Sequence, residues 1–108
     1  MKKLVTVIAS VGVLCLAGSV ARSQEVANGE KVYKAKCASC HGPDGKGETA
    51  AGKATKARDL ALPEVKKETD ADWTDIVVKG KNKMPSYDKK LTDAEVKDVV
   101  AYMRSLVK

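Results

Sequence analysis

The stretch Cys37-Ala38-Ser39-Cys40-His41 decides the fold of this chain, because it places two thiols and an imidazole within five residues. The pattern C-x-x-C-H predicts a site for attachment of a c-type heme. Two cysteines three positions apart on one helical turn can each add to a vinyl group of the same porphyrin. The histidine directly after them then lies under the ring, where its neutral imidazole can bind the iron as the proximal ligand.

Three other interpretations of this stretch remain open. A zinc site needs four ligands, but His41 is the only histidine, and Cys15, the only other cysteine, lies in an N-terminal leader. A redox disulfide of the C-x-x-C type is expected in a βαβ setting, whereas the surrounding sequence is helical in pattern. The third alternative is a pair of structural cysteines beside a surface histidine. Heme attachment is favoured over all three.

Two motifs, Cys37 to His41 and Lys83-Met84-Pro85, give the chain a resemblance to the small class I cytochromes c that carry electrons in bacteria. The resemblance spans roughly residues 25–108. It implies an all-α cytochrome c fold, in which three to four helices wrap round one heme and the N- and C-terminal helices cross. It also implies that the cofactor is a single heme c, attached through both cysteines.

Residues 1–21 are predicted to be a secretory signal peptide. Two lysines give a positive start, residues 4–17 are almost unbroken apolar, and Ser19-Val20-Ala21 suits a cut after its alanine. The alternative is an uncleaved membrane anchor, because residues 4–21 just reach the lower limit of a membrane span. The glycines, the serines and the small residues just before the predicted cut favour cleavage. The protein is then expected in the periplasm.

The remaining residues, 22–108, are predicted to form one monoheme cytochrome c domain. A chain this short buries only a modest core, and the lack of phenylalanine fits a core filled by a porphyrin. The sequence has 20 Lys+Arg and 14 Asp+Glu, a formal charge of +6. Two of the lysines lie in the leader, so the domain would carry +4. A nucleic-acid binder would show clustered arginines and interleaved aromatics, so no nucleic-acid partner is expected.

The scattered lysines have two interpretations. They form either an ordinary solvated surface or a positive rim round the heme edge that steers docking to acidic patches on redox proteins. Lys79, Lys81 and Lys83 are the best candidates for such a rim, because they flank Met84. The protein is expected to be a monomer that meets membranes only through partner complexes.

Three helices are predicted from the local pattern. The first runs from Asn28, which can cap it, to Ala38. The second begins after Thr69, an N-cap residue, and ends at Gly80 in the usual place for a left-handed cap. The third opens with the capping box Thr92-Asp93-Ala94-Glu95.

The apolar residues of the second and third helices follow helical spacing. On the second they are Trp73, Ile76 and Val77, and on the third they are Val96, Val99, Val100, Met103, Leu106 and Val107. Residues 48–66, which precede the second helix, are predicted to be a loop with a short turn of helix. Leu60 and Leu62 are its expected anchors, and Pro63 is a helix breaker.

The resemblance implies contacts that local pattern does not show. In this family a glycine and an aromatic residue of the first helix pack against the last helix. Gly29 and Tyr33 occupy the matching places, opposite Val99 and Tyr102. On the same grounds Met103 is expected to face the heme.

The chain departs from the family pattern beyond the heme motif. Many relatives carry a Gly-Pro pair further along, whose proline carbonyl holds the other nitrogen of the proximal histidine. Gly42-Pro43 is too close to His41 to be that pair, and no second Gly-Pro follows. The hydrogen-bond partner of His41 is therefore unassigned.

Met84 is predicted to be the second axial ligand of the iron, so that the metal ligands are His41 and Met84. It lies in a Gly- and Asn-containing loop, and Pro85 restricts it to extended geometry. The alternatives are a loop methionine that merely covers apolar surface, and Met103 as the ligand, which ranks far below. Trp73 is most simply a core residue; a sharper interpretation gives its indole N–H to a heme propionate.

These residues predict a soluble periplasmic carrier of single electrons that is not an enzyme and has no catalytic residue. An iron bound by imidazole and thioether has no position free for a substrate, and sulfur ligation in an apolar pocket favours the ferrous state. One alternative is a heme subunit of a larger redox complex. Another is an open-site peroxidase or ligand sensor, if Met84 is not bound. A dithiol binding module without heme is the last.

Overall fold

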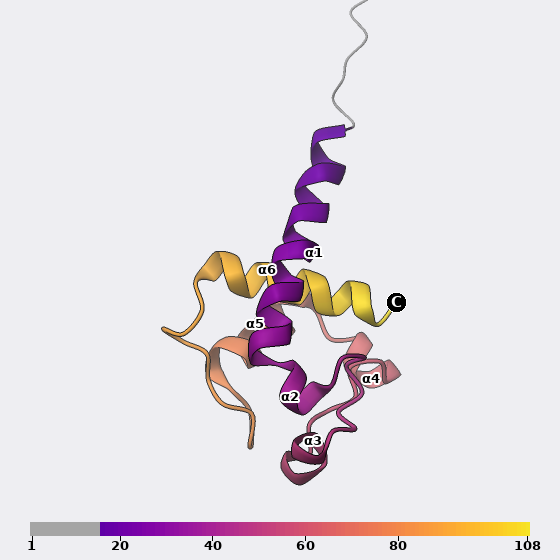
Figure 1. Cartoon of the computed structure of the whole chain (residues 1–108), viewed down its shortest axis with the longest axis vertical. Coiled ribbons are helices and arrows are strands. Elements are labelled where there is room, and N and C mark those ends of the chain that lie inside the picture. Colours follow the sequence, from indigo (N-terminus) through magenta and orange to yellow (C-terminus); the bar gives the residue numbers. More distant parts are fainter. Residues whose placement is uncertain (1–15) are drawn as a thin grey trace, which may run out of the picture.

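A computed structural model describes residues 16–108, and over this part the chain is all-α (Figure 1). The predicted all-α cytochrome c fold is confirmed, with three long helices and three short ones among the described residues. They are α1 (Leu16–Lys36), α2 (Ala38–His41), α3 (Ala50–Thr55), α4 (Pro63–Lys66), α5 (Asp70–Lys79) and α6 (Asp93–Leu106). Within the same residues no helix combines the length and the apolar character needed to cross a bilayer.

The first helix begins earlier than predicted. Asn28 does not cap it, because α1 is already helical from Leu16 and runs to Lys36. Adding a residue to an existing helix is far easier than nucleating one, and no proline interrupts residues 16–27. An ion pair of 3.3 Å between Glu25 and Lys97 of α6 fastens this extension to the domain. Most of the predicted signal peptide, residues 1–15, lies outside the described residues, and its cleavage stays a prediction.

The predicted crossing of the terminal helices is confirmed, and Figure 1 shows α1 passing across α6. A Cβ atom at Gly29 would overlap the backbone carbonyl of Asp98 and lie 2.8 Å from Cβ of Tyr102. Only glycine therefore permits this close approach. One turn along α1, the ring of Tyr33 packs against that of Tyr102 with centroids 5.2 Å apart. Tyr33 and Val99 are fully buried at this crossing.

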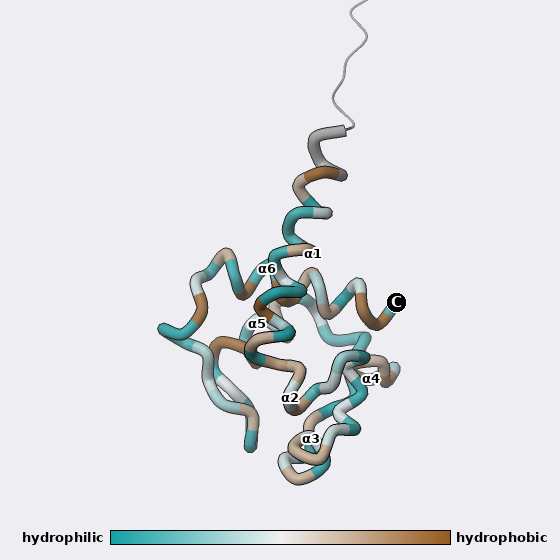
Figure 2. The backbone as a smooth tube through the Cα atoms, in the orientation of Figure 1, coloured by the Kyte–Doolittle hydropathy of each residue, from teal (hydrophilic) through white to brown (hydrophobic). Residues whose placement is uncertain are grey.

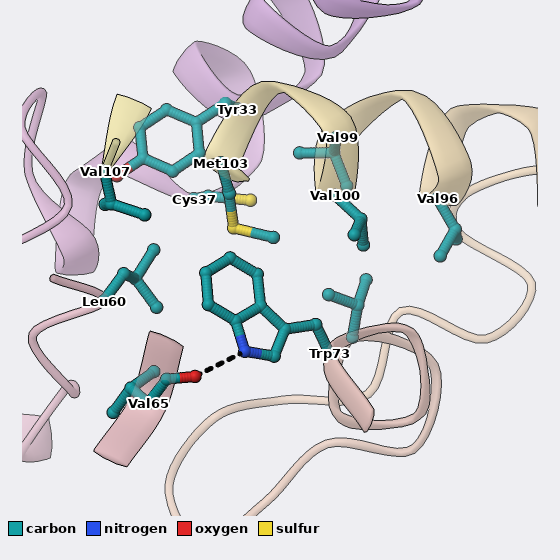
Figure 3. Packing of buried hydrophobic residues seen from close by; sticks show 11 residues of the cluster. Tyr33, Cys37, Leu60, Val65, Trp73, Val96, Val99, Val100, Met103 and Val107 are labelled. Carbon is teal, nitrogen blue, oxygen red and sulfur yellow. Dashed lines mark hydrogen bonds between the residues drawn. The ribbon is translucent and has the colours of Figure 1, made fainter. Parts of the chain in front are cut away.

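The N-caps of the last two long helices are as predicted. Thr69 and Asp72 form a capping box on α5, and Thr92 and Glu95 form another on α6. Gly80 ends α5 with φ of 76°, but its ψ of 169° is extended instead of the left-handed helical value that was expected. Along α6 apolar positions alternate with polar ones (Figure 2). The buried ones, Val96, Val99, Val100 and Met103, enter the core (Figure 3).

The stretch between the heme motif and α5 holds two short helices, α3 and α4, where a single turn was expected. Leu60 is buried and anchors this stretch as predicted. The prediction was wrong for Leu62, whose exposed fraction is 41%. Leu62 is the extended residue that precedes α4, and Pro63 at the first helical position fixes that geometry.

Candidate heme site

A cavity of about 300 Å³ lies between α2, α5, α6 and the loop after α5. Its lining includes all six predicted site residues, which are Cys37, Cys40, His41, Trp73, Met84 and Met103. These residues come from positions up to 66 apart in the chain, so the fold has gathered them. The surface of the cavity as a whole is mainly apolar, and exposed lysines border it.

The two cysteines sit on one turn, as the heme-attachment interpretation requires. Cys37 is the N-cap of α2, Cys40 lies within the helix, and the amide of His41 donates to the Cys37 carbonyl at 2.9 Å. Both thiols are free. Burial raises the pKa of the Cys37 thiol to about 11. A redox dithiol depends on a thiol with a lowered pKa, so this shift gives that alternative no support.

Thr49 fixes the end of the heme motif. Its hydroxyl donates to the carbonyls of Ser39 and Cys40, at 2.7 and 3.0 Å, and accepts from the Gly52 amide at 2.9 Å. A Cβ atom at Gly52 would overlap the Cys40 carbonyl. The first turn of α3 therefore packs directly on the backbone of α2, which satisfies carbonyls that a short helix leaves unpaired.

The hydrogen-bond partner of His41, which sequence left unassigned, is the carbonyl oxygen of Arg58, 3.3 Å from Nδ1. This contact places the proton on Nδ1 and leaves the lone pair of Nε2 available to a metal. Burial lowers the pKa of His41, so the neutral imidazole that a metal requires predominates at neutral pH. The two residues are 17 apart with no local pattern between them, so no sequence signal pointed to Arg58.

The loop that carries Met84 is tightly built. Lys81 and Met84 exchange two backbone hydrogen bonds of 3.1 and 2.9 Å, and Asn82 between them has a positive φ of 53°. A Cβ atom at Gly80 would lie 2.7 Å from the Met84 carbonyl, so the loop folds back on the end of α5. The amide of Tyr87 donates to Val77 of α5 at 3.0 Å. These contacts hold the partly buried Met84 side chain at the cavity.

Two further contacts join this loop to other parts of the site. The Tyr87 hydroxyl donates to the carbonyl of Lys36, next to Cys37, at 2.9 Å. Nζ of Lys83 donates to the carbonyl of Ala54 at the end of α3, at 3.3 Å. The Met84 loop is therefore connected to both the heme motif and α3.

Trp73 lies buried at the cavity, but its hydrogen bond is not the one that was proposed. The indole N–H donates to the carbonyl of Val65 at 3.1 Å (Figure 3). The interpretation that gave this N–H to a heme propionate is therefore wrong, because the donor has a protein acceptor in α4. The guanidinium of Arg104 stacks over the indole at 3.7 Å. Contact between the Trp73 ring and a heme stays a prediction.

The chemistry of these side chains fits a covalently bound heme. Two free thiols on one turn, a neutral imidazole and a thioether border one mainly apolar cavity. Among the described residues no three His, Cys, Asp or Glu side chains come together as a metal cluster, which gives the zinc alternative no support. The helical fold and this cavity together define a small class I c-type cytochrome domain with one heme.

Comparison with known proteins agrees with this class. Residues 24–103 match the family described as cytochrome c oxidase, cbb3-type, subunit III. A cytochrome c6 of Porphyra purpurea is 33% identical over 97% of this chain and 94% of its own length. A cytochrome c6 of Parathermosynechococcus lividus is 34% identical over 73% of this chain and 87% of its own length.

A longer relative matches as well. The cbb3-type cytochrome c oxidase subunit CcoP of Azospirillum sp. (strain B510) is 33% identical over 87% of this chain. The chain spans 33% of the length of that relative. On these matches the chain belongs to the c-type cytochrome family, whose members bind heme c covalently.

Proposed function

We propose that this protein is a periplasmic carrier of single electrons, with a heme c attached through Cys37 and Cys40 and ligated by His41 and Met84. The observation that carries the proposal is that one cavity is bordered by both thiols, the imidazole and the thioether. Bound heme c supplies a one-electron redox centre. With His41 and Met84 both as ligands, a bound iron would have no vacant position, so the proposed role is transport of electrons and not catalysis of a reaction.

The surrounding residues support such a carrier. The Arg58 carbonyl orients the imidazole, and the backbone bonds between Lys81 and Met84 preorganise a weak thioether ligand. The apolar lining keeps water away and disfavours the extra charge of ferric iron. A site held this firmly changes little in geometry between oxidation states, which favours fast electron exchange.

The proposed ligation is tested with a matched pair of variants, Met84→Leu and Met103→Leu, because both methionines border the cavity. Oxidised wild-type protein should show the weak near-infrared band of sulfur-to-iron ligation. Met84→Leu should lose this band, bind carbon monoxide and have a lower reduction potential, whereas Met103→Leu should keep the band. A wild-type protein without the band, or loss of the band in Met103→Leu alone, would refute ligation by Met84.

The docking surface proposed for redox partners is a lysine rim, defined as Lys36, Lys56, Lys81 and Lys83. All four side chains border the cavity and are exposed. Lys79, which sequence also suggested, faces Asp75 at 3.7 Å in an exposed i,i+4 pair and does not border the cavity. A positive rim at this place would steer an acidic partner toward the heme edge.

A second candidate is a heme subunit of a larger redox complex, and one observation favours it: the match to part of a CcoP oxidase subunit. The two candidates differ in what accompanies the protein in its native cell. Size-exclusion chromatography of a gently prepared extract, followed by heme staining, separates them. A heme band at the size of one chain supports the free carrier, and a band confined to a large complex supports the subunit.

A further inference from the structure

The backbone that accepts the His41 hydrogen bond lies in a segment with no helix of its own. Arg58 belongs to residues 56–62, between α3 and α4. Lys56, which begins this segment, has a positive φ of 56°, a conformation that non-glycine residues adopt infrequently. The position of the Arg58 carbonyl therefore depends on contacts that the segment makes with the rest of the domain.

The side chain of Arg58 makes one of these contacts, an ion pair with Glu68. Nη1 of Arg58 lies 3.1 Å from Oε2 of Glu68 in hydrogen-bond geometry and 2.7 Å from Oε1. The two side chains are only 35% and 23% exposed. Oε1 is shielded from solvent, and within residues 16–108 it accepts no hydrogen bond, so this guanidinium is its only charged partner. A half-buried charge pair of this kind is costly to break.

Glu68 is itself held in place by α6. Its backbone carbonyl accepts a hydrogen bond from Nη2 of Arg104. The same guanidinium donates from Nη1 to the Lys66 carbonyl at 3.0 Å and from Nε to Oδ1 of Asp70 at 2.8 Å. The Glu68 amide donates to Val65 at 3.1 Å. The backbone of Glu68 is therefore held in place, and its side chain can anchor the segment of Arg58.

We propose that Glu68 is a positioning residue for the iron ligand His41. It holds the guanidinium of Arg58, and thereby fixes the backbone carbonyl of the same residue at the distance where Nδ1–H of the imidazole donates to it. Hydrogen-bond partners of a histidine that binds a metal fix the orientation of its ring and tune its basicity. The proposal rests on the ligation by His41 proposed above.

Loss of the pair has two effects that must be told apart. A freed segment weakens the Nδ1–H bond and makes the imidazole a poorer electron donor, which raises the reduction potential. Loss of the carboxylate charge that pairs with Arg58, a residue bordering the cavity, also raises the potential, without any movement. The potential alone therefore does not distinguish positioning from simple electrostatics, whereas solvent exchange of the Nδ1 proton does.

The experiment compares Glu68→Gln with Glu64→Gln in the full, heme-loaded chain. Glu64 is an exposed carboxylate one turn earlier, in α4. Exchange of the His41 Nδ1 proton is followed by NMR in the reduced protein. Glu68→Gln should speed exchange about fivefold or more, in line with loss of a hydrogen bond of ordinary net strength, and should raise the potential. Glu64→Gln should leave exchange unchanged.

A double-mutant cycle tests whether the side chains of Arg58 and Glu68 act together. Arg58→Met should speed exchange as Glu68→Gln does, and the double variant should add little, because the two side chains act as a unit. Glu68→Asp, which keeps the charge, should be intermediate and provides a milder variant if Glu68→Gln folds poorly. Wild-type exchange in Glu68→Gln would overturn the positioning role alone. A wild-type protein without an iron-bound imidazole would overturn the proposed ligation as well.

Discussion

Replacement of Gly29 by alanine should loosen the whole domain, because it acts where α1 and α6 touch. The added methyl group would overlap the backbone carbonyl of Asp98 and come within 2.8 Å of Cβ of Tyr102. Neither neighbour is the flexible end of a side chain, so the helices themselves must move apart. Such a shift also disturbs the fully buried Tyr33 and Val99.

The expected size follows from two opposing effects. Overpacking against rigid backbone costs up to about 3 kcal/mol, whereas alanine in a helix interior is better than glycine by about 1 kcal/mol. The net loss of unfolding free energy is about 2 kcal/mol, which lowers the melting temperature by about 8–16 °C in a domain of this size.

The assay is urea unfolding at equal heme loading, followed by far-ultraviolet circular dichroism. Asn28→Ala is the matched control, because this neighbouring side chain is exposed in the same helix. The unfolding free energy of Asn28→Ala should stay within about 0.5 kcal/mol of the wild type. If Gly29→Ala is as stable as Asn28→Ala, then α1 and α6 do not meet at Gly29 and do not cross in this way.

Three other expectations can be checked directly. Cys37→Ser combined with Cys40→Ser should release all heme into acid acetone, whereas the wild type keeps it. Lys83→Gln should slow reaction with an acidic partner at low salt, the difference should vanish as salt rises, and Lys31→Gln on α1 should have no effect. Hydrogen bonds from the N-cap of α5 lower the pKa of Asp72 below its ordinary 3.8, so its stabilisation is present above that pH and is lost as pH falls through the folded pKa. Asp72→Asn should flatten this acid-induced loss in a pH series of urea midpoints.

Local signals predicted the parts of the fold that are local. The caps of α5 and α6 depend on side chains three residues apart, so Thr69 and Thr92 could be identified from sequence. The start of α1 has no such local signal, because the helix continues upstream of the possible cap at Asn28 and its Glu25 pairs with Lys97 of α6. That ion pair joins residues far apart in the sequence, and no pattern in either segment predicts it.

The candidate site shows the same division. The proposed attachment and ligand residues, which border the cavity, could be named from two short motifs. What surrounds them could not, because the acceptors are backbone carbonyls brought close by folding. The Arg58 carbonyl for His41 and the Val65 carbonyl for Trp73 are both of this kind. A carbonyl has no residue type, so composition and spacing do not reveal which one will be near.

The unbroken course of α1 through Ala21 and Arg22 bears on the order of events during maturation. Peptidases act on chain whose backbone is open, and a helical turn hides the bond they need. If the predicted leader is removed after Ala21, removal should be faster before this helical turn forms and Glu25 pairs with Lys97. A folded molecule that escaped the export machinery uncut would then be a poor substrate, and its leader would persist.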